Sequence, residues 1–254
     1  MVKKAVSVLL IVATLFCMCT VFASAKEAGE LDDLYPDTYY WNAVSWAVHE
    51  DIMLGCQGGL FRPNQQVKRE QVAVVLYRVA GYPEIHYTFN FTDTGECSEE
   101  VKQAINWCYA MDIIYGYSDG TFRPKDGITR AELCAMLHRY VENCDPSLEY
   151  GDGYFDCPYC GSFVNNRIFD KQHWDGQVWC SYCNVFFNPE CQFDDVKTDS
   201  IFMGDIKFCY RNGIVKGFSQ TMFGPDECVT RAQFATMVWR MVGCPVGVDY
   251  SGTA

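Results

Sequence analysis

The sequence predicts a mostly α-helical protein in which three related helix-loop-helix units pack together. A small β-rich segment is expected between the second and third units. Two observations lead to this prediction: the stretch 116–132 recurs three times with fixed internal spacing, and two Cys-x-x-Cys pairs fall in the longest gap between copies. Internal repetition at fixed offsets indicates an architecture of similar units packed on one another.

Four residue types keep their register in all three copies. Each copy has a Gly six residues before a Phe, a Pro two residues after that Phe and an Arg eight residues after it. In copy order these residues are Phe61, Phe122 and Phe223; Gly55, Gly116 and Gly217; Pro63, Pro124 and Pro225; and Arg69, Arg130 and Arg231. The constant offsets identify one structural unit used three times.

The second copy shows how each stretch leads into a helix. Asp119-Gly120 is a turn dipeptide, because glycine adopts positive φ without steric cost. Thr129 and Glu132 have the spacing of a capping box, in which each side chain bonds the backbone of the other. The third copy keeps this box as Thr230 and Gln233. The first copy has Lys68 at the cap position, so its helix should lose about 1 kcal/mol of capping.

Apolar residues at helical spacing surround each stretch and predict two helices per unit. A two-helix unit is too small to bury its own apolar stripes, so the three units must share one core. Trp46 and Trp107 point inward in this register and are expected in that core. The apolar stripes of the first unit are Tyr40, Val44, Ala47 and Val48, then Val72, Val75, Leu76 and Val79.

At this point the sequence resembles the S-layer homology domain. The resemblance rests on Phe-x-Asp, an amphipathic helix, Gly-x-x-Asp-Gly-Thr-Phe-x-Pro and Ile-Thr-Arg-Ala-Glu. Residues 128–132 match the last motif fully, 229–233 match closely, and 67–71 match only at the apolar residue and the Arg. The resemblance implies a pseudo-threefold bundle with grooves between neighbouring repeats, formed by residues 26–88, 89–143 and 193–254.

Residues 1–25 are predicted to be a secretory signal peptide. Lys3 and Lys4 precede a long apolar run, and Ala23-Ser24-Ala25 is a small-residue cleavage site. The alternative is an uncleaved membrane anchor. After cleavage no stretch is long and apolar enough to span a membrane. The expected location is therefore outside the cell, at the cell surface or cell wall.

The charge balance argues against a nucleic-acid partner. The formal net charge is −12, and removal of Lys3 and Lys4 with the signal takes it to −14. Affinity for nucleic acid comes from neutralising phosphates, which a strongly acidic chain does poorly. Net negative charge instead favours solubility.

The inserted segment, residues 144–192, is predicted to be a zinc ribbon with a structural Zn²⁺. Its cysteines have the spacing C-x2-C-x19-C-x2-C, which is typical of four-thiolate zinc sites. So small a segment has little core, and the metal would supply most of its folding free energy. The alternative is a pair of disulfides, since the chain is expected to be secreted. The four candidate ligands are Cys157, Cys160, Cys180 and Cys183.

Other cysteines fall at equivalent helix positions. Cys108 and Cys209 share one position in the second and third units, and Cys134 stands where the other units have Ala73 and Ala235. We expect these three cysteines to be small, buried core residues.

The recurring Arg is the most informative candidate for binding. It lies in the first turn of a helix, where free backbone N–H groups and the helix dipole favour an anion. The alternative is an Arg that pairs with Asp119 or Asp126 and braces the loop. From the residues alone the two interpretations are equally supported.

The family resemblance favours the anion. It implies non-covalent attachment to a cell-wall secondary polysaccharide, in which a pyruvate ketal would supply the carboxylate. Arg130 is expected to dominate, because its unit keeps the complete loop and capping box, with Arg231 weaker and Arg69 weakest. The predicted polymer-binding residues are Arg130, Arg231, Arg69, Thr129, Thr230, Asp119 and Gly120.

No motif for catalysis is found, so we expect no enzyme activity. The sequence has no Gly-x-Ser-x-Gly, His-Glu-x-x-His or phosphate-binding glycine loop. Two alternatives to wall binding remain open. One is a zinc- or thiol-dependent surface enzyme that uses the cysteine-rich segment. The other is a surface adaptor that recruits a partner protein through the ribbon.

Overall fold

A computed structural model describes residues 28–86, 88–144, 193–219 and 221–245, together with four short strands between 154 and 187. The predicted signal peptide lies outside the described residues. Among these residues, none of the helices combines the length and the apolarity that crossing a membrane requires.

Each repeat contributes two α-helices, which confirms the predicted, mostly helical fold. A short 3-10 helix, η1 (Ala28–Glu30), precedes them. The first helices of the three repeats are α2 (Trp41–His49), α4 (Glu99–Ala110) and α6 (Met203–Arg211). The second helices are α3 (Arg69–Val79), α5 (Arg130–Cys144) and α7 (Arg231–Met241).

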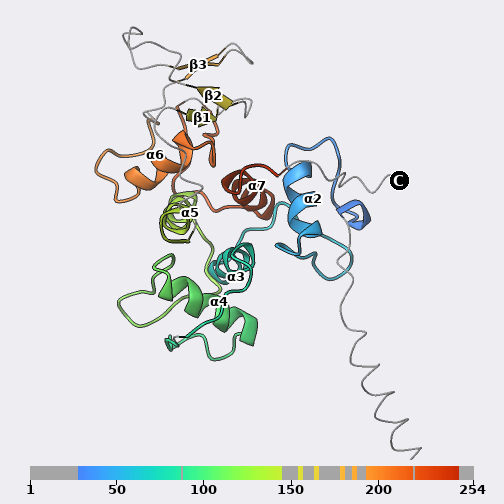
Figure 1. Cartoon of the computed structure of the whole chain (residues 1–254), viewed down its shortest axis with the longest axis vertical. Helices are drawn as coiled ribbons and strands as arrows, with labels where there is room; N and C mark the ends of the chain where they lie inside the picture. Colours follow the sequence, from blue (N-terminus) through green and yellow to red (C-terminus); the bar gives the residue numbers. More distant parts are fainter. Residues whose placement is uncertain are drawn as a thin grey trace, which may run out of the picture.

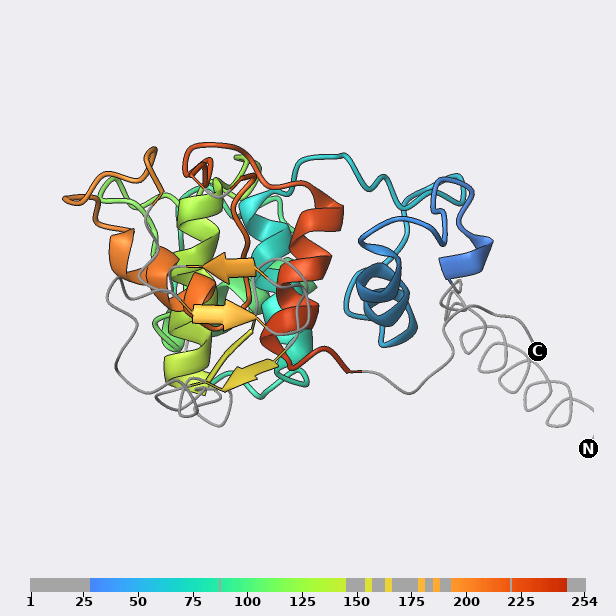
Figure 2. The ribbon, with the colours of Figure 1, turned by 90° about the horizontal axis from the view of Figure 1, so that it is seen from above.

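The second helices form the centre of the molecule and the first helices lie around them (Figure 1). Figure 2 shows α3, α5 and α7 side by side. Each second helix packs on the first helix of the next repeat: α3 on α4, α5 on α6, and α7 on α2. The last pair closes the ring, so the three repeats bury one shared core that includes Trp46 and Trp107, as predicted.

A ring of backbone hydrogen bonds joins the three loops just before the central helices. Val67 N–H donates to Val229 O at 2.8 Å, Val229 N–H to Ile128 O at 3.0 Å, and Ile128 N–H to Val67 O at 3.2 Å. All three side chains are fully buried. The apolar residue that precedes each cap is therefore the point where the repeats meet around the pseudo-threefold axis.

Both predicted capping boxes are present. Glu132 Oε2 accepts from Thr129 N–H at 2.9 Å, and Thr129 Oγ1 accepts from Glu132 N–H at 3.2 Å. Thr230 and Gln233 repeat this exchange at α7. Lys68 provides no side-chain cap, as predicted, although Gln71 Oε1 still accepts from its N–H at 3.0 Å.

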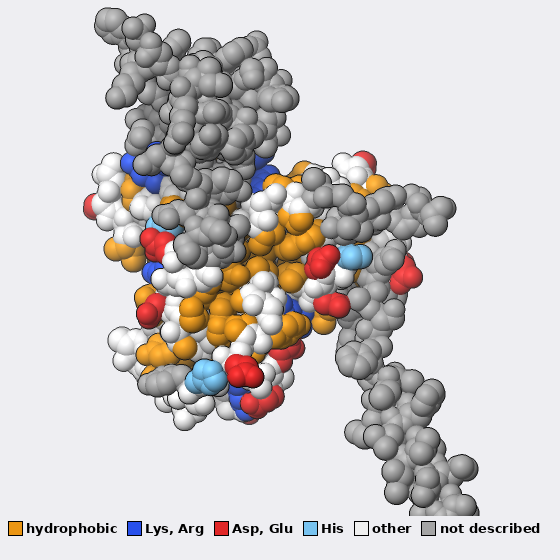
Figure 3. All heavy atoms as spheres, in the orientation of Figure 1, with side chains coloured by type: hydrophobic (Ala, Val, Ile, Leu, Met, Phe, Trp, Pro, Cys, Tyr) orange, Lys and Arg blue, Asp and Glu red, His pale blue; other side chains and the backbone are white. Residues whose placement is uncertain are grey.

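The recurring Gly allows an aromatic residue from the segment before the first helix to pack closely on the loop. A Cβ built at Gly116 would lie 2.2 Å from Phe91 Cε1, and one at Gly217 would lie 2.5 Å from Phe193 Cε1. Since real Cβ contacts are longer than 3.0 Å, any other residue would displace these aromatic rings. On the face in Figure 3, hydrophobic side chains gather where the central helices meet.

The inserted segment contains two pairs of antiparallel strands. β1 (Tyr154–Asp156) pairs with β2 (Phe163–Asn165), and β3 (Val178–Cys180) pairs with β4 (Val185–Phe187). The predicted ligands Cys157, Cys160 and Cys183 lie outside the described residues, and only the backbone of Cys180 is described. The zinc site therefore stays a prediction.

Candidate functional site

Each recurring Arg is bound to the loop of the following repeat. Arg130 donates from Nε to Phe223 O at 2.9 Å and from Nη2 to Lys216 O at 2.5 Å. Arg69 makes the same two bonds to Phe122 O and Tyr115 O, both at 3.0 Å. Arg231 makes them to Phe61 O and Leu54 O, both at 2.8 Å. The predicted bracing role is thus filled by backbone carbonyls and not by Asp119 or Asp126.

Aromatic rings flank these guanidinium groups to different extents. The Cζ atom of Arg130 lies 4.5 Å from the ring centroids of both Phe218 and Phe223. Arg69 lies 5.0 Å from the ring of Tyr117 and 5.1 Å from that of Phe122. Arg231 lies 4.5 Å from the Phe61 ring. Its loop has Cys56 at the position that Tyr117 and Phe218 occupy in the other two.

The guanidinium groups are buried but keep one nitrogen accessible. Arg130 is 4% exposed and Arg231 is 6% exposed, and burial lowers the pKa of both side chains. Among the described residues neither Arg forms an ion pair, and neither Nη1 atom has a hydrogen-bond partner. Among the described residues, Ser45 Oγ is the fully buried side-chain atom that lacks a partner. The two unpartnered Nη1 atoms are therefore not fully buried, and each keeps accessible surface.

The helix starts differ from the sequence-based expectation of free N–H groups. Arg130 N–H donates to Glu227 O at 2.9 Å, and Ala131 N–H donates to Pro225 O at 3.0 Å. The next N–H, of Glu132, is taken by Thr129 Oγ1. The neighbouring loop occupies the other two central helix starts in the same way. An anion would therefore meet the Arg side chain and not the end of the helix, while Thr129 and Thr230 serve as caps.

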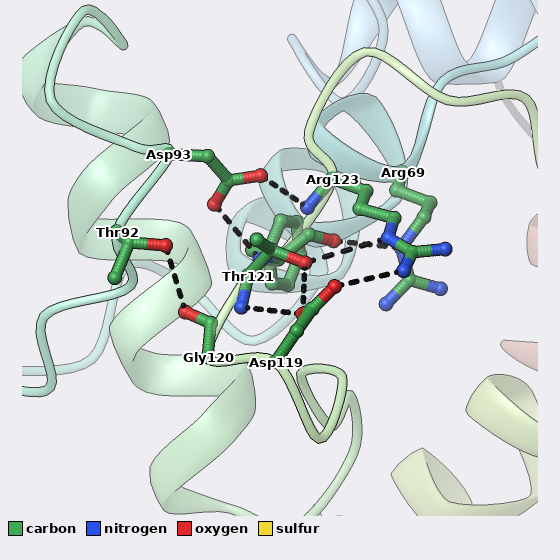
Figure 4. A network of polar contacts seen from close by, with 8 residues as sticks. Arg69, Thr92, Asp93, Asp119, Gly120, Thr121 and Arg123 are labelled. Carbon is green, nitrogen blue, oxygen red and sulfur yellow. Dashed lines mark hydrogen bonds and ion pairs between the residues drawn. The ribbon is translucent and has the colours of Figure 1, made fainter.

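The Asp119-Gly120 turn lies in the loop that receives Arg69 and not in the loop that receives Arg130 (Figure 4). Gly120 has φ +79°, as the turn requires. Asp119 accepts from Thr121 Oγ1 at 2.6 Å and from Arg123 Nη2 at 3.0 Å. The Thr121 bonds, and then Arg123, lower the pKa of Asp119 to about 2. The structure therefore separates predicted site residues that are close in sequence.

One set of acids that supports the loops was missed in the sequence. Asp195 Oδ1 and Oδ2 accept from Phe223 N–H at 2.8 Å and Gly224 N–H at 2.6 Å. The equivalent carboxylates, Asp33 and Asp93, each accept two consecutive N–H groups of their own loop. In every unit this Asp lies two residues after a Leu or Phe, and that recurrence could have identified the set from the sequence.

A second recurring Arg was missed. Nine residues after the first Arg, each central helix carries another: Arg78, Arg139 and Arg240. Arg78 Nη2 pairs with Glu100 Oε1 at 2.6 Å, and its Nη1 donates to Asp51 O at 3.2 Å. Arg139 Nη1 donates to Ile113 O at 3.4 Å, and its Cζ lies 4.8 Å from the Tyr115 ring. The constant offset of nine would have revealed this set.

The groove at Arg130 is lined mainly by cationic and aromatic groups. It has a cavity volume of about 350 Å³. Its described lining includes three cationic side chains and no carboxylate. The cations are Arg130, Lys216 and Arg240, and Tyr39 and Phe218 are among the other lining residues.

The groove at Arg231 is equivalent in the fold but different in character. Its cavity volume is about 280 Å³, and its lining includes the aliphatic side chains of Leu54, Val74 and Val101. Its lining carries two cations, Arg78 and Arg231, and two carboxylates, Glu70 and Glu100, so its formal charges cancel. Two grooves with the same backbone thus present different chemistry.

Comparison with known proteins identifies the repeats. A family model of the S-layer homology domain matches residues 30–73, 90–134 and 192–235. A cellulosome-anchoring protein of Acetivibrio thermocellus is 31% identical over 37% of this chain and 22% of its own length. An endoglucanase of a Bacillus species is 26% identical over 56% of this chain and 16% of its own. A surface-layer 125 kDa protein of Lysinibacillus sphaericus is 25% identical over 50% of this chain and 11% of its own.

The chain therefore spans less than a quarter of the length of these relatives. The shared region is an anchoring domain without catalytic function, even where the relative is named as an enzyme. The expected location at the cell surface and cell wall is confirmed. With three matched repeats that cover more than half of its residues, the chain belongs to the S-layer homology domain family.

Proposed function

We propose that this chain attaches non-covalently to a cell-wall secondary polysaccharide and binds an anionic group of that polymer in the Arg130 groove. The observation that supports this most directly is the state of the Arg130 side chain. It is a buried cation that is held by two carbonyls, flanked by two rings and directed into a cationic groove.

The two carbonyls replace part of the hydration that this buried charge has lost, but they supply no countercharge. An anion at Nη1 would supply the missing countercharge. Each charge-assisted hydrogen bond contributes about 1.5–3 kcal/mol. Lys216 and Arg240 line the same groove and add favourable potential for an anion.

The lining suits a carboxylate on a sugar ring, such as a pyruvate ketal. Phe218 is 58% exposed and offers an apolar ring face at the mouth of the groove, and Tyr39 is 69% exposed. A ketal carboxylate would accept a charge-assisted hydrogen bond from Nη1 of Arg130, while its methyl group and sugar ring contact aromatic surface. Pyruvylation is thus our preferred chemistry for the anion.

The test measures sedimentation of the chain with purified wall sacculi, before and after the secondary polymer is stripped. Arg130→Ala should weaken binding about 10-fold or more, and Arg130→Lys should lose part of that because a planar fork is replaced by a point charge. The matched control is Lys197→Ala, which removes an exposed positive charge of the same repeat that does not line the groove. Thermal melting of each variant separates lost binding from lost folding.

If Arg130→Ala is folded and binds as well as the wild type, Arg130 only braces the neighbouring loop and does not contact the polymer. Binding that survives removal of the polymer would point to another wall component.

We also propose that the inserted segment binds a structural Zn²⁺ through Cys157, Cys160, Cys180 and Cys183. The backbone pairing supports this, since each Cys-x-x-Cys pair falls where one strand ends and turns toward its antiparallel partner. The ion, when bound, would join the two strand pairs. Elemental analysis should find about one zinc per chain. Absence of zinc, with all four thiols oxidised, would establish disulfides instead.

A further inference from the structure

We propose that Cys134 of α5 and Cys209 of α6 form a disulfide that links repeats two and three. Both side chains are fully buried, and they belong to helices that pack directly on each other. The Cys209 thiol donates to Cys134 O at 3.4 Å. A thiol that reaches the backbone of the facing residue requires the close helix approach that a disulfide needs.

The pseudo-threefold arrangement provides an internal comparison. At the same place between α3 and α4, the Cys108 thiol donates to Ala73 O at 3.7 Å. Between α2 and α7 the equivalent residues are Ala47 and Ala235, both buried. Small residues therefore occupy this contact in all three interfaces. Thiols occupy both sides only between α5 and α6.

The environment determines when the bond forms. Burial raises the pKa of the Cys209 thiol well above its usual value, with a hydrogen bond to the Cys134 side chain as the next cause. The thiolate is the attacking species, so exchange in the closed core is slow. The bond is therefore expected to form while the repeats assemble and not after they have packed.

The oxidant is a small-molecule or protein disulfide, R–S–S–R, of the kind present outside the cytosol. One cysteine thiolate attacks it, forms a mixed disulfide and releases R–S⁻. The second cysteine, also as thiolate, then attacks the sulfur of the first and releases the other R–S⁻. Two protein thiols are oxidised, one external disulfide is reduced, and the two cysteine protons end on two R–SH molecules.

The test refolds the reduced full chain in a glutathione redox buffer and then denatures it with iodoacetamide, without reductant. Peptide mapping by mass spectrometry should find a Cys134–Cys209 cross-link two hydrogen masses lighter than the separate peptides, and Cys108 should not be linked to either. The same chain folded under reducing conditions and then briefly exposed to oxidised glutathione should show alkylated Cys134 and Cys209.

Melting temperature gives a second readout. The link closes a loop of about 75 residues, so the refolded, oxidised chain should melt roughly 10 °C above the reduced chain. Cys209→Ala should remove most of that difference, whereas the matched variant Cys108→Ala should keep it. Alkylation of both Cys134 and Cys209 after oxidative refolding, or equal effects of the two alanine variants, would overturn the proposal.

Discussion

The Arg130 and Arg231 grooves have the same backbone and different linings. In both, the Arg donates to two carbonyls of the next repeat's loop and lies beside the recurring Phe. Around that Arg, three equivalent lining positions carry the same residue, and the remaining equivalent positions differ; the shared pairs are Gly55 and Gly217, Gln71 and Gln233, and Arg78 and Arg240. Contacts that use the backbone are kept in all three repeats, while the side chains that line the grooves differ from one repeat to the next.

Four equivalent pairs of positions account for the difference in charge and polarity. Lys216 in the Arg130 groove corresponds to Leu54, Phe218 to Cys56, Thr236 to Val74, and Tyr39 to Glu100. Each of the first three exchanges removes a charged, aromatic or hydroxyl group, and the fourth adds an acid that pairs with Arg78. We therefore keep Arg130 as the predicted dominant site, although for a reason other than the completeness of repeat two.

The largest effect that distinguishes the grooves is expected from the loop carboxylates. Asp195→Asn and Asp33→Asn each replace two charged acceptor oxygens by one neutral oxygen and should each reduce the free energy of unfolding by about 1–3 kcal/mol. Denaturant titration should show similar losses. Polymer affinity should fall only in Asp195→Asn, because Asp195 supports the loop that holds Arg130. Equal loss of affinity would mean that both grooves bind.

Exchange of the lining cation is expected to give an intermediate effect. Lys216→Leu should weaken binding of a pyruvylated disaccharide several-fold, because a positive charge near the anion is lost. The reciprocal Leu54→Lys should create measurable binding at the Arg231 groove. Calorimetry on both variants tests this, and a gain of the second site without any change at the first would argue against the assignment of Lys216.

A smaller effect is expected from the acid that neutralises the Arg231 groove. Glu100→Gln leaves Arg78 without its ion-pair partner and makes that groove more positive. Since Glu100 is 44% exposed, the loss of stability should stay below about 1 kcal/mol. Weak new anion binding, measured by NMR from the amide shifts of residues 52–56, would confirm that the charge of Glu100 limits anion binding in this groove. Unchanged shifts at high ligand concentration would contradict it.

The smallest effect is expected at Asp119, whose loop serves Arg69. Its pKa is lowered to about 2, so its stabilising contribution is present above the ordinary Asp pKa and is lost as pH falls through about 2. Carboxyl NMR signals should titrate at that pH. Asp119→Asn should leave polymer binding at pH 7 unchanged. A clear loss of binding would restore the Asp119-Gly120 turn as part of the polymer site.

Local features of this fold were predictable and the pairing of site residues was not. The capping box at Thr129 and the turn at Gly120 depend on neighbours within a few residues, and both are present as expected. The contacts of the recurring Arg join residues that are far apart in sequence: Arg231 bonds Phe61 across 170 positions. Periodicity identifies that Arg as special, but only the closed ring of repeats shows which loop receives it.

The central claim is that one groove dominates and that its Arg binds the anion. The most direct test is a calorimetric titration of the full chain with a pyruvylated disaccharide. It compares the wild type, Arg130→Lys and Arg231→Lys. We predict one dominant site that is weakened by Arg130→Lys and little changed by Arg231→Lys. Three sites of equal affinity, or equal weakening by the two variants, would contradict the account.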